Sequence, residues 1–276
     1  MDIIDLTSWE GFEKTIADLL KARDRRLAQS ADFMSPLLYR GHADSSWKLT
    51  TTLERHTGRL LSLKEYYRTI LRTIPQVETF TDASWAVESY QDFEKWVEGS
   101  GSEFMGLRGR FPAYDYFVYL RHHGFPSPLL DWTRSPYVAA YFAFREPEAI
   151  GKFVSIFVYV EYVSGHKSGS ITDTAISVLT PYVRSHERHF QQQSHYTICT
   201  VIRDSDHWYA CHEDTFALDK KDQDKLVKIN IPVSERRIAL ARLEQFNINA
   251  FSLFGSEESL METLAMRDML FPEGRF

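Results

Sequence analysis

Cysteine is scarce in this chain, and a long apolar run is missing. The 276 residues include two cysteines, Cys199 and Cys211, which are too few for a disulfide framework and suit a reducing compartment. The longest apolar run, residues 153–160, is far too short to span a bilayer, and no basic and apolar leader pattern follows Met1. We therefore expect a cytoplasmic protein that does not associate with a membrane.

Several catalytic motifs are missing as well. The sequence has no glycine-rich phosphate loop, no G-x-S-x-G elbow and no H-E-x-x-H pair, which disfavours P-loop kinases, serine hydrolases and zincins. Cys199, His207, Cys211 and His212 lack the C-x-x-C spacing of a zinc site, so no metal site is predicted. The net charge of −6 gives no broad basic surface and disfavours bulk electrostatic capture of nucleic acid.

Helical patterns dominate the first half of the chain. Thr7 and Glu10 have the spacing of a capping box, and the apolar periodicity after them predicts a helix over residues 8–28. The same periodicity predicts a helical insertion around residues 60–110 and a further helix over residues 114–123.

Strand patterns are concentrated in the second half. Residues 37–40 and 49–53 read as short extended pieces, whereas residues 153–160, 198–203 and 226–231 are rich in β-branched and aromatic side chains. Because helices come first and strands follow, we predict an α+β fold. Its mixed or antiparallel sheet would be flanked by helices and preceded by an N-terminal helical part.

Two charged residues stand where an unpaired charge is costly. Arg40 ends a short apolar segment just before Gly41, and its planar guanidinium suits a phosphate or a carboxylate. Asp131 follows Leu129 and Leu130 and needs a partner such as Arg40, a backbone N–H group or a substrate hydroxyl. We therefore expect Arg40 and Asp131 to lie in one cleft. A structural salt bridge between them explains the pattern equally well.

Further polar groups surround Asp131 in residues 122–133. This segment leaves a helix and is punctuated by prolines, so we expect one loop to carry His122, Asp131 and Thr133. His122 lies in the last helical turn, where the helix dipole favours a cation. Trp132 has a large apolar body that suits packing behind a loop. His122 and Trp132 are therefore expected to support the site.

A third polar segment, residues 185–194, contains Glu187 and Gln192. Its local pattern is that of a solvated helix end. Glu257 and Glu258 follow Ser256 and read first as the acidic first turn of a helix. The local pattern alone assigns no catalytic role to any of these residues.

Two long segments resemble the FRG domain family, which is named for a Phe-Arg-Gly signature. Residues 38–49 are similar to its opening motif, with Tyr39 in place of the eponymous Phe. Residues 121–133, followed by residues 139–143, are similar to its central motif. The chain is therefore identified as a member of this family.

Weaker likenesses extend the resemblance over nearly the whole chain. Residues 188–196 look like a third motif, in which Ser194 stands where the family usually has Gly, and residues 247–254 look like the closing segment. The resemblance thus implies a single FRG-type domain spanning residues 1–276.

The motif order of the family resembles that of the ADP-ribosyltransferase fold, in which NAD is the substrate. Carried over to this chain, the resemblance implies four catalytic positions: Arg40, Asp131, Thr133 and Gln192. The positions implied to contact the nucleotide are Arg40, His122, Trp132 and Tyr141. The third motif contains no Glu-x-Glu or Gln-x-Glu pair. The late acid or base is therefore left open among Gln192, Glu187, Glu257 and Glu258.

The resemblance implies an effector of bacterial phage defence or of a toxin system. Such an effector would cleave NAD or transfer ADP-ribose from it, with a small-molecule nucleotide as its ligand. One alternative is a non-catalytic module that senses a nucleotide or a phage component. Another is an effector that processes nucleic acid. The macromolecular target and the oligomeric state are left open.

Overall fold

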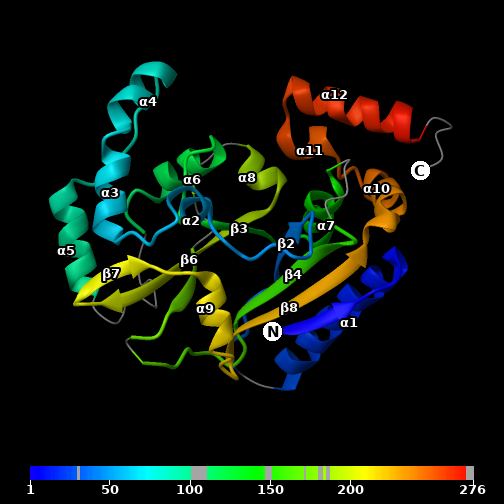
Figure 1. Ribbon diagram of the computed structural model, residues 1–276, viewed down its shortest axis with the longest axis horizontal. Coiled ribbons are helices and arrows are strands. Elements are labelled where there is room, and N and C mark those ends of the chain that lie inside the picture. Colours follow the sequence, from blue (N-terminus) through cyan, green and yellow to red (C-terminus); the bar gives the residue numbers. More distant parts are fainter. Residues whose placement is uncertain are drawn as a thin grey trace.

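An eight-stranded mixed sheet with helices around it forms the centre of the molecule (Figure 1). The computed structural model describes residues 1–29, 32–100, 111–146, 151–170, 172–179, 183–184 and 187–271. Within these ranges the sheet order is β1-β8-β4-β2-β3-β6-β5, and β7 pairs with β6. The strands are β1 (Asp2–Asp5), β2 (Leu38–His42), β3 (Leu130–Thr133), β4 (Phe153–Tyr162), β5 (Ala175–Leu179), β6 (Ser194–Arg203), β7 (Asp206–Tyr209) and β8 (Gln223–Pro232).

The strand directions confirm the predicted α+β class. The pair β1 and β8 is parallel, whereas the other strand pairs are antiparallel. The α-helices in the described ranges are α1 (Trp9–Gln29), α2 (Thr52–Thr57), α3 (Leu63–Leu71), α4 (Ile74–Thr81), α5 (Tyr90–Ser100), α6 (Tyr114–His122), α7 (Pro136–Phe144), α8 (Arg188–Gln191), α9 (His212–Ala217), α10 (Arg236–Gln245), α11 (Ala250–Phe254) and α12 (Glu257–Ala265). Shorter turns are a 3₁₀ helix (Val233–Glu235) and a π-helical turn (Met266–Leu270). None of the helices in these ranges combines the length and the apolarity needed to cross a membrane.

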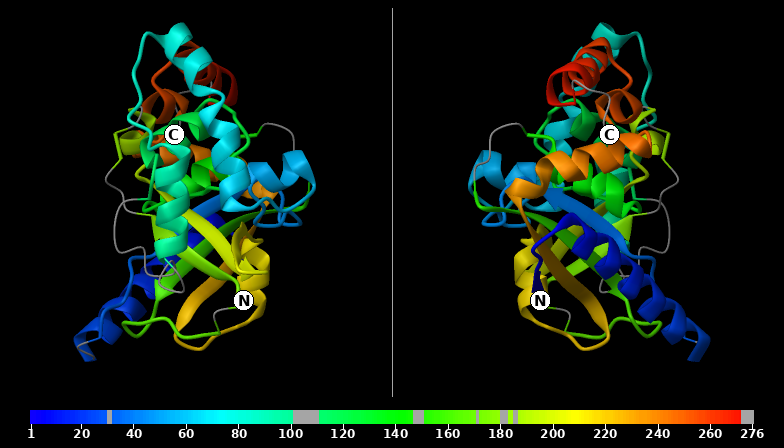
Figure 2. Two further views of the ribbon diagram at one scale, coloured as in Figure 1. Left: turned by 90° about the vertical axis from the view of Figure 1, so that its left-hand side faces the viewer. Right: turned by 90° about the vertical axis from the view of Figure 1, so that its right-hand side faces the viewer.

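Two helical groups pack on different parts of the sheet, as Figures 1 and 2 show. In one group, α1, α7 and α10 bury Phe12 and Leu240 against strand residues such as Ile229. In the other, α3, α5 and α6 bury Phe117 and its neighbours against β6 residues such as Ile198. The N-terminal helix expected over residues 8–28 is confirmed as α1. The predicted insertion around 60–110 contains α3, α4 and α5, while residues 101–110 lie outside the described ranges.

The sheet opens between β2 and β3. These strands share one register pair, Tyr39 with Thr133, whereas β2 and β4 share five. Beyond that pair, β2 and β3 share no further register pairs. Backbone groups on the facing edges are therefore left for side chains to bind.

Helix α7 packs directly on β2 because residue 41 is a glycine. A Cβ atom at Gly41 would lie 1.9 Å from the carbonyl oxygen of Ala139 and 2.8 Å from the amide nitrogen of Ala143. Ser135 begins the helix, since its side chain accepts a hydrogen bond of 3.2 Å from the N–H of Val138. The glycine and the two alanines thus fix α7 against the strand that carries Arg40.

Three predictions of local structure were wrong. Arg40 lies in the middle of β2, which continues through His42, and residues 130–133 form a strand where we expected a loop. Residues 49–53 are not a strand, because Thr51 and Glu54 form a capping box that begins α2. Strands β1 and β5 were not predicted either.

Candidate functional site

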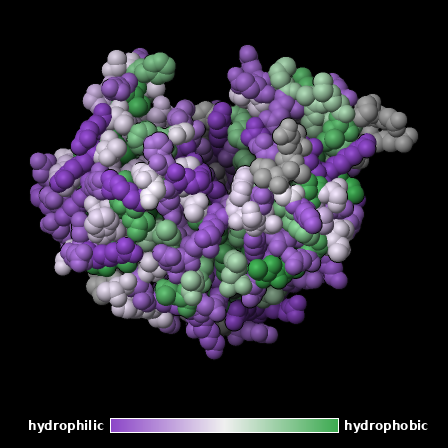
Figure 3. All heavy atoms as spheres, viewed as in Figure 1, coloured by the Kyte–Doolittle hydropathy of each residue, from purple (hydrophilic) through white to green (hydrophobic). Residues whose placement is uncertain are grey.

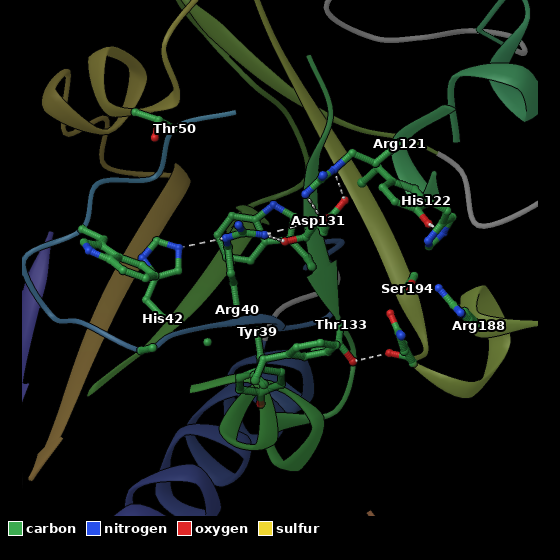
Figure 4. A pocket seen from close by; sticks show the side chains of 18 of the residues that line it. Tyr39, Arg40, His42, Thr50, Arg121, His122, Asp131, Thr133, Arg188 and Ser194 are labelled. Carbon is green, nitrogen blue, oxygen red and sulfur yellow. Dashed lines mark hydrogen bonds and ion pairs between the residues drawn. The ribbon is translucent and has the colours of Figure 1, made fainter. Parts of the chain in front are cut away.

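A cavity of about 1020 Å³ lies where β2 and β3 separate. Its walls come from these strands and β6, the segment after β2, and helices α2, α6, α7, α8 and α11. Figure 3 shows the surface hollowed between the part that carries α4 and the part that carries α12. In Figure 4, His42 and Thr50 lie on one side of this cavity, His122 and Arg188 lie on the other, and Arg40 lies between them.

Arg40 occupies the gap between the two strands. Its Nη1 atom donates a 2.7 Å hydrogen bond to the backbone carbonyl of Asp131, and its Nε atom donates a 3.0 Å hydrogen bond to Nε2 of His42. The same Nη1 lies 3.9 Å from Oδ2 of Asp131. Arg40 thus takes the place of ladder hydrogen bonds that β2 and β3 do not make. The expected proximity of Arg40 and Asp131 is found.

Burial lowers the pKa of both Arg40 and His42. Desolvation lowers the pKa of Arg40 to about 10, although Asp131 opposes the shift, so the guanidinium remains charged at neutral pH. Burial and the adjacent Arg40 cation lower the pKa of His42 to about 3. A neutral His42 is the form that can accept the Arg40 hydrogen bond at Nε2.

Asp131 has a second and closer cationic partner, Arg121. Nε of Arg121 donates a 3.1 Å hydrogen bond to Oδ1, and Nη2 donates to Oδ2, so the guanidinium grips both carboxylate oxygens (Figure 4). Burial would raise the pKa of Asp131, but Arg121 and Arg40 outweigh burial and lower it. Asp131 is therefore an ionised, fixed negative charge, and 37% of its side-chain surface stays open.

Sequence reasoning missed Arg121 as a site residue. Arg121 lies at the C-terminal end of α6, next to His122, and the resemblance placed it at the start of the central motif without giving it a role. The sequence did contain a signal that could have indicated Arg121, because Asp131 needs a positively charged partner. A helix end one loop away supplies one, and it also suits a cation because of the helix dipole.

His122 joins the site through Tyr196. Nε2 of His122 lies 2.8 Å from the Tyr196 hydroxyl, and Nδ1 of His189 lies 3.3 Å from the same oxygen. Tyr196 is fully buried and lies opposite Asp131 in the pairing of β3 with β6. His122 lines the cavity beside Arg121, and its hydrogen bond with Tyr196 fixes the two side chains relative to each other.

Thr133 and Gln192 also line the cavity, and their polar groups are engaged. The Thr133 hydroxyl donates a 2.7 Å hydrogen bond to the Gln192 carbonyl and accepts one of 3.1 Å from the N–H of Ser135. Nε2 of Gln192 donates to the carbonyl of Leu253 at 3.0 Å. The structure thus brings Arg40, Asp131, Thr133 and Gln192 together, while their catalytic roles stay predictions.

Trp132 belongs to the core behind this wall. Its side chain is 3% exposed, its indole N–H donates to the Thr197 hydroxyl at 2.8 Å, and its ring packs against Tyr159. Successive strand residues point to opposite faces, so a ring that enters this core lies on the other face from Asp131 and Thr133. Trp132 is among the residues that line the cavity, its ring is largely buried in the core, and its predicted contact with a nucleotide stays a prediction.

Tyr141, predicted to contact the nucleotide, does not line this cavity. The α7 residues that line the cavity include Ala139 and Phe142, whereas Tyr141 is 2% exposed and lines a separate cavity of about 550 Å³. At 3.6 residues per turn, Tyr141 lies roughly 200° around the helix from Ala139. Its hydroxyl donates a 3.0 Å hydrogen bond to Oε1 of Glu262 on α12.

The alternative acids lie outside the cavity wall. Glu187 is exposed just before α8, and Glu257 and Glu258 are exposed in the first turn of α12. The carboxylates in the described wall are Asp131 and Glu146. Residues 185 and 186 of the polar third segment lie outside the described ranges. Within those ranges, no three His, Cys, Asp or Glu side chains gather where they could hold one metal ion.

The cavity has the opposite charge to the chain. Five basic side chains and two carboxylates line it, a surplus of three positive charges in a protein of net charge −6. Basic residues on facing walls of a hollow raise the local concentration of anionic ligands. Those five residues are Arg40, Lys48, Arg55, Arg121 and Arg188.

Comparison with known families identifies this part of the chain. Residues 35–151 match the family described as the FRG domain, so the chain contains an FRG domain over these residues. The match contains β2, α6 and β3, which supply Arg40, Arg121 and Asp131, and it also contains α7. The weaker third and closing motifs lie beyond the matched residues. A search of curated proteins and a search of solved structures each gave no match. The likeness to the ADP-ribosyltransferase fold stays a prediction.

Proposed function

We propose that the cavity binds NAD and that the protein cleaves the bond between nicotinamide and ribose. The surplus of positive charge around Arg40 is the observation that carries this proposal. A pyrophosphate matches the planar forks of arginine, and about 1020 Å³ is room for a ligand larger than a mononucleotide. The FRG resemblance supports the further proposal that the protein acts as an effector in bacterial defence or as a toxin.

The fixed charge of Asp131 suits the bond cleavage. When the bond between ribose C1′ and the pyridinium nitrogen breaks, its electron pair moves to nicotinamide and leaves an oxocarbenium-like ribose. A carboxylate held in place by Arg121 stabilises that cation without having to reorganise. Water or a target nucleophile then adds to C1′ and loses its proton to the solvent. Asp131 acts here as a charge, since Arg121 already holds both of its oxygens.

A second candidate function is binding of the same nucleotide without turnover. It is favoured by the hydrogen bonds that already engage Thr133 and Gln192, because neither group is left to activate water. In this alternative the protein senses the nucleotide, and the ion pairs of Asp131 serve only to arrange the cationic wall.

Two measurements on the same samples separate the two functions. Chromatography measures how much nicotinamide is released from NAD, and calorimetry measures the affinity for NAD. Arg40→Gln should weaken NAD binding by roughly 10- to 100-fold, the value of a hydrogen-bonded charge. Asp131→Asn should lower turnover by at least ~100-fold, as loss of electrostatic stabilisation does, with a smaller effect on affinity. Arg25→Gln on the exposed side of α1 removes the same charge far from the cavity and is the matched control.

Thermal unfolding of each variant shows whether a loss reflects the site or the fold. NAD binding without nicotinamide release in the wild-type protein would establish the second candidate. If the wild-type protein neither binds nor cleaves NAD, both functions are wrong.

A further inference from the structure

Trp47 differs from the other aromatic residues of the cavity wall in its exposure. Its side chain is 45% exposed, whereas Tyr39, Trp132 and Tyr196 are each at most 3% exposed. An indole is costly to leave in water, and a large exposed aromatic at a concave site commonly marks a contact with a ligand.

Two further aromatics of this wall, Phe142 and Phe254, are partly exposed, and the ring of Phe254 is already covered. The guanidinium carbon of Arg145 lies 4.6 Å from its ring centroid and that of Arg188 lies 5.6 Å away. Phe142 makes an edge contact at 5.9 Å. These neighbours leave Phe254 little room to stack on a further ring.

The segment that presents Trp47 is held on both sides. Before it, the Ser45 N–H donates to the carbonyl of Phe153 at 2.9 Å, and the Ser46 N–H donates to the Asp44 carboxylate at 2.7 Å. After it, Leu49 is fully buried and its N–H donates to Glu213 at 2.8 Å. Because the backbone on either side of Trp47 is already held, less conformational entropy is lost when a ligand stacks on its ring.

Two basic residues accompany Trp47 on this side of the cavity. Lys48 and Arg55 are exposed and line the wall, and Arg55 is oriented by a 2.8 Å hydrogen bond to the carbonyl of Thr50. The nearest aromatic neighbour of Trp47 in the described wall, His42, meets it at 60° with centroids 6.1 Å apart and does not stack on it. An exposed indole accompanied by cationic side chains suits a ligand that carries a nucleobase and a phosphate.

We propose that Trp47 stacks on a nucleobase of the ligand while Lys48 and Arg55 contact the adjacent phosphate. This inference rests on the proposed function and deepens it, because it assigns the ring contact that Tyr141 cannot make. With Arg40 between this side and the Arg188 side (Figure 4), the ligand class is a dinucleotide that spans the cavity with its pyrophosphate at Arg40.

Calorimetric titration of the full chain with NAD, AMP and ribose 5-phosphate tests the role of Trp47. Trp47→Ala should weaken NAD and AMP binding by about 10-fold or more, the value of one base stack, and leave ribose 5-phosphate unchanged. Trp47→Phe keeps a ring and should retain most of the affinity. Phe80→Ala, which removes a 91% exposed aromatic from α4 outside the cavity wall, should change nothing.

The outcomes separate this inference from the proposed function. Wild-type binding of NAD that Trp47→Ala leaves intact overturns the stacking role and keeps the proposed function. An equal loss for ribose 5-phosphate also overturns it, because the effect would then not involve the base. If the wild-type protein binds neither NAD nor AMP, the proposed function fails and the role of Trp47 fails with it.

Discussion

Tyr39 carries a hydroxyl that the fold does not use. The side chain is 2% exposed, and within the described residues its hydroxyl oxygen has no hydrogen-bond partner. Burial accordingly raises the pKa of Tyr39 to about 12. The ring packs in the cluster that joins α1 and α7, so its apolar body does the structural work.

Tyr39→Phe should therefore leave the protein equally stable or make it more stable by up to ~1–3 kcal/mol, the penalty for an unsatisfied buried polar group. Tyr159→Phe is the matched control. The Tyr159 hydroxyl donates a 2.6 Å hydrogen bond to Asp224, so its removal should lower the free energy of unfolding. Urea unfolding of both variants measures the difference. A clear loss of stability in Tyr39→Phe would show that the hydroxyl is bonded after all.

At the level of single residues, the sequence indicated Arg40 and Asp131 because each is a charge next to apolar neighbours. It did not indicate Arg121, because an arginine at a helix end needs no special explanation. Nor could it exclude Tyr141, since which face of α7 meets the cavity depends on how that helix docks. Trp47 went unnoticed as a ligand contact because its exposure depends on the path of the segment after β2.

Among the elements, α7 and β2 depend most strictly on each other. A methyl group at residue 41 would have to displace the backbone of α7 at Ala139, because no flexible side chain is there to yield. Gly41→Ala should destabilise the fold by at least ~1–3 kcal/mol, the usual cost of overpacking, and should disturb the Arg40 edge.

Gly99→Ala is the control for this change. Gly99 lies in α5, and no atom of the described residues lies within 4 Å of the point that an alanine methyl group would occupy there, so alanine should be neutral or stabilising by up to ~1 kcal/mol. Thermal unfolding with calorimetry compares the two. Equal stability of Gly41→Ala and the wild type would mean that α7 can move away without loss.

The elements that sequence reasoning found are those whose signal is local. Helix α1 has a long amphipathic period, and β4 is a continuous apolar run. β1 and β3 have four residues each and carry charges, and their strand conformation comes from distant partners, β8 for the first and β2 and β6 for the second. Neither the periodicity of apolar residues nor the β-propensity of a short segment can predict pairing between strands that lie far apart in the sequence.

For the molecule as a whole, two buried imidazoles make stability depend on pH. Burial and Arg40 lower the pKa of both His42 and His212 to about 3. Between that value and about 6.5, where an unfolded chain titrates, the unfolded state binds more protons than the folded state. The stabilisation is therefore complete above about pH 6.5 and is lost as the pH falls toward 3.

Each imidazole should lower the free energy of unfolding by roughly 2 kcal/mol between pH 7 and pH 5. Urea titrations at the two pH values measure this loss. His42→Gln removes one titrating group and should show a smaller pH dependence than the wild type. A free energy of unfolding that does not change between pH 7 and pH 5 would contradict the neutral state of these side chains.

The contact between Gly41 and Ala139 also limits how this sequence can change over generations. The two positions lie far apart along the chain, yet any side chain at position 41 would clash with the backbone at position 139. Any lineage that acquires a side chain at position 41 must first relocate α7, which several simultaneous changes would be needed to achieve. The two FRG motifs are therefore expected to be inherited as one unit, and a chimera that joins them from distant members should fold only when this contact is compatible.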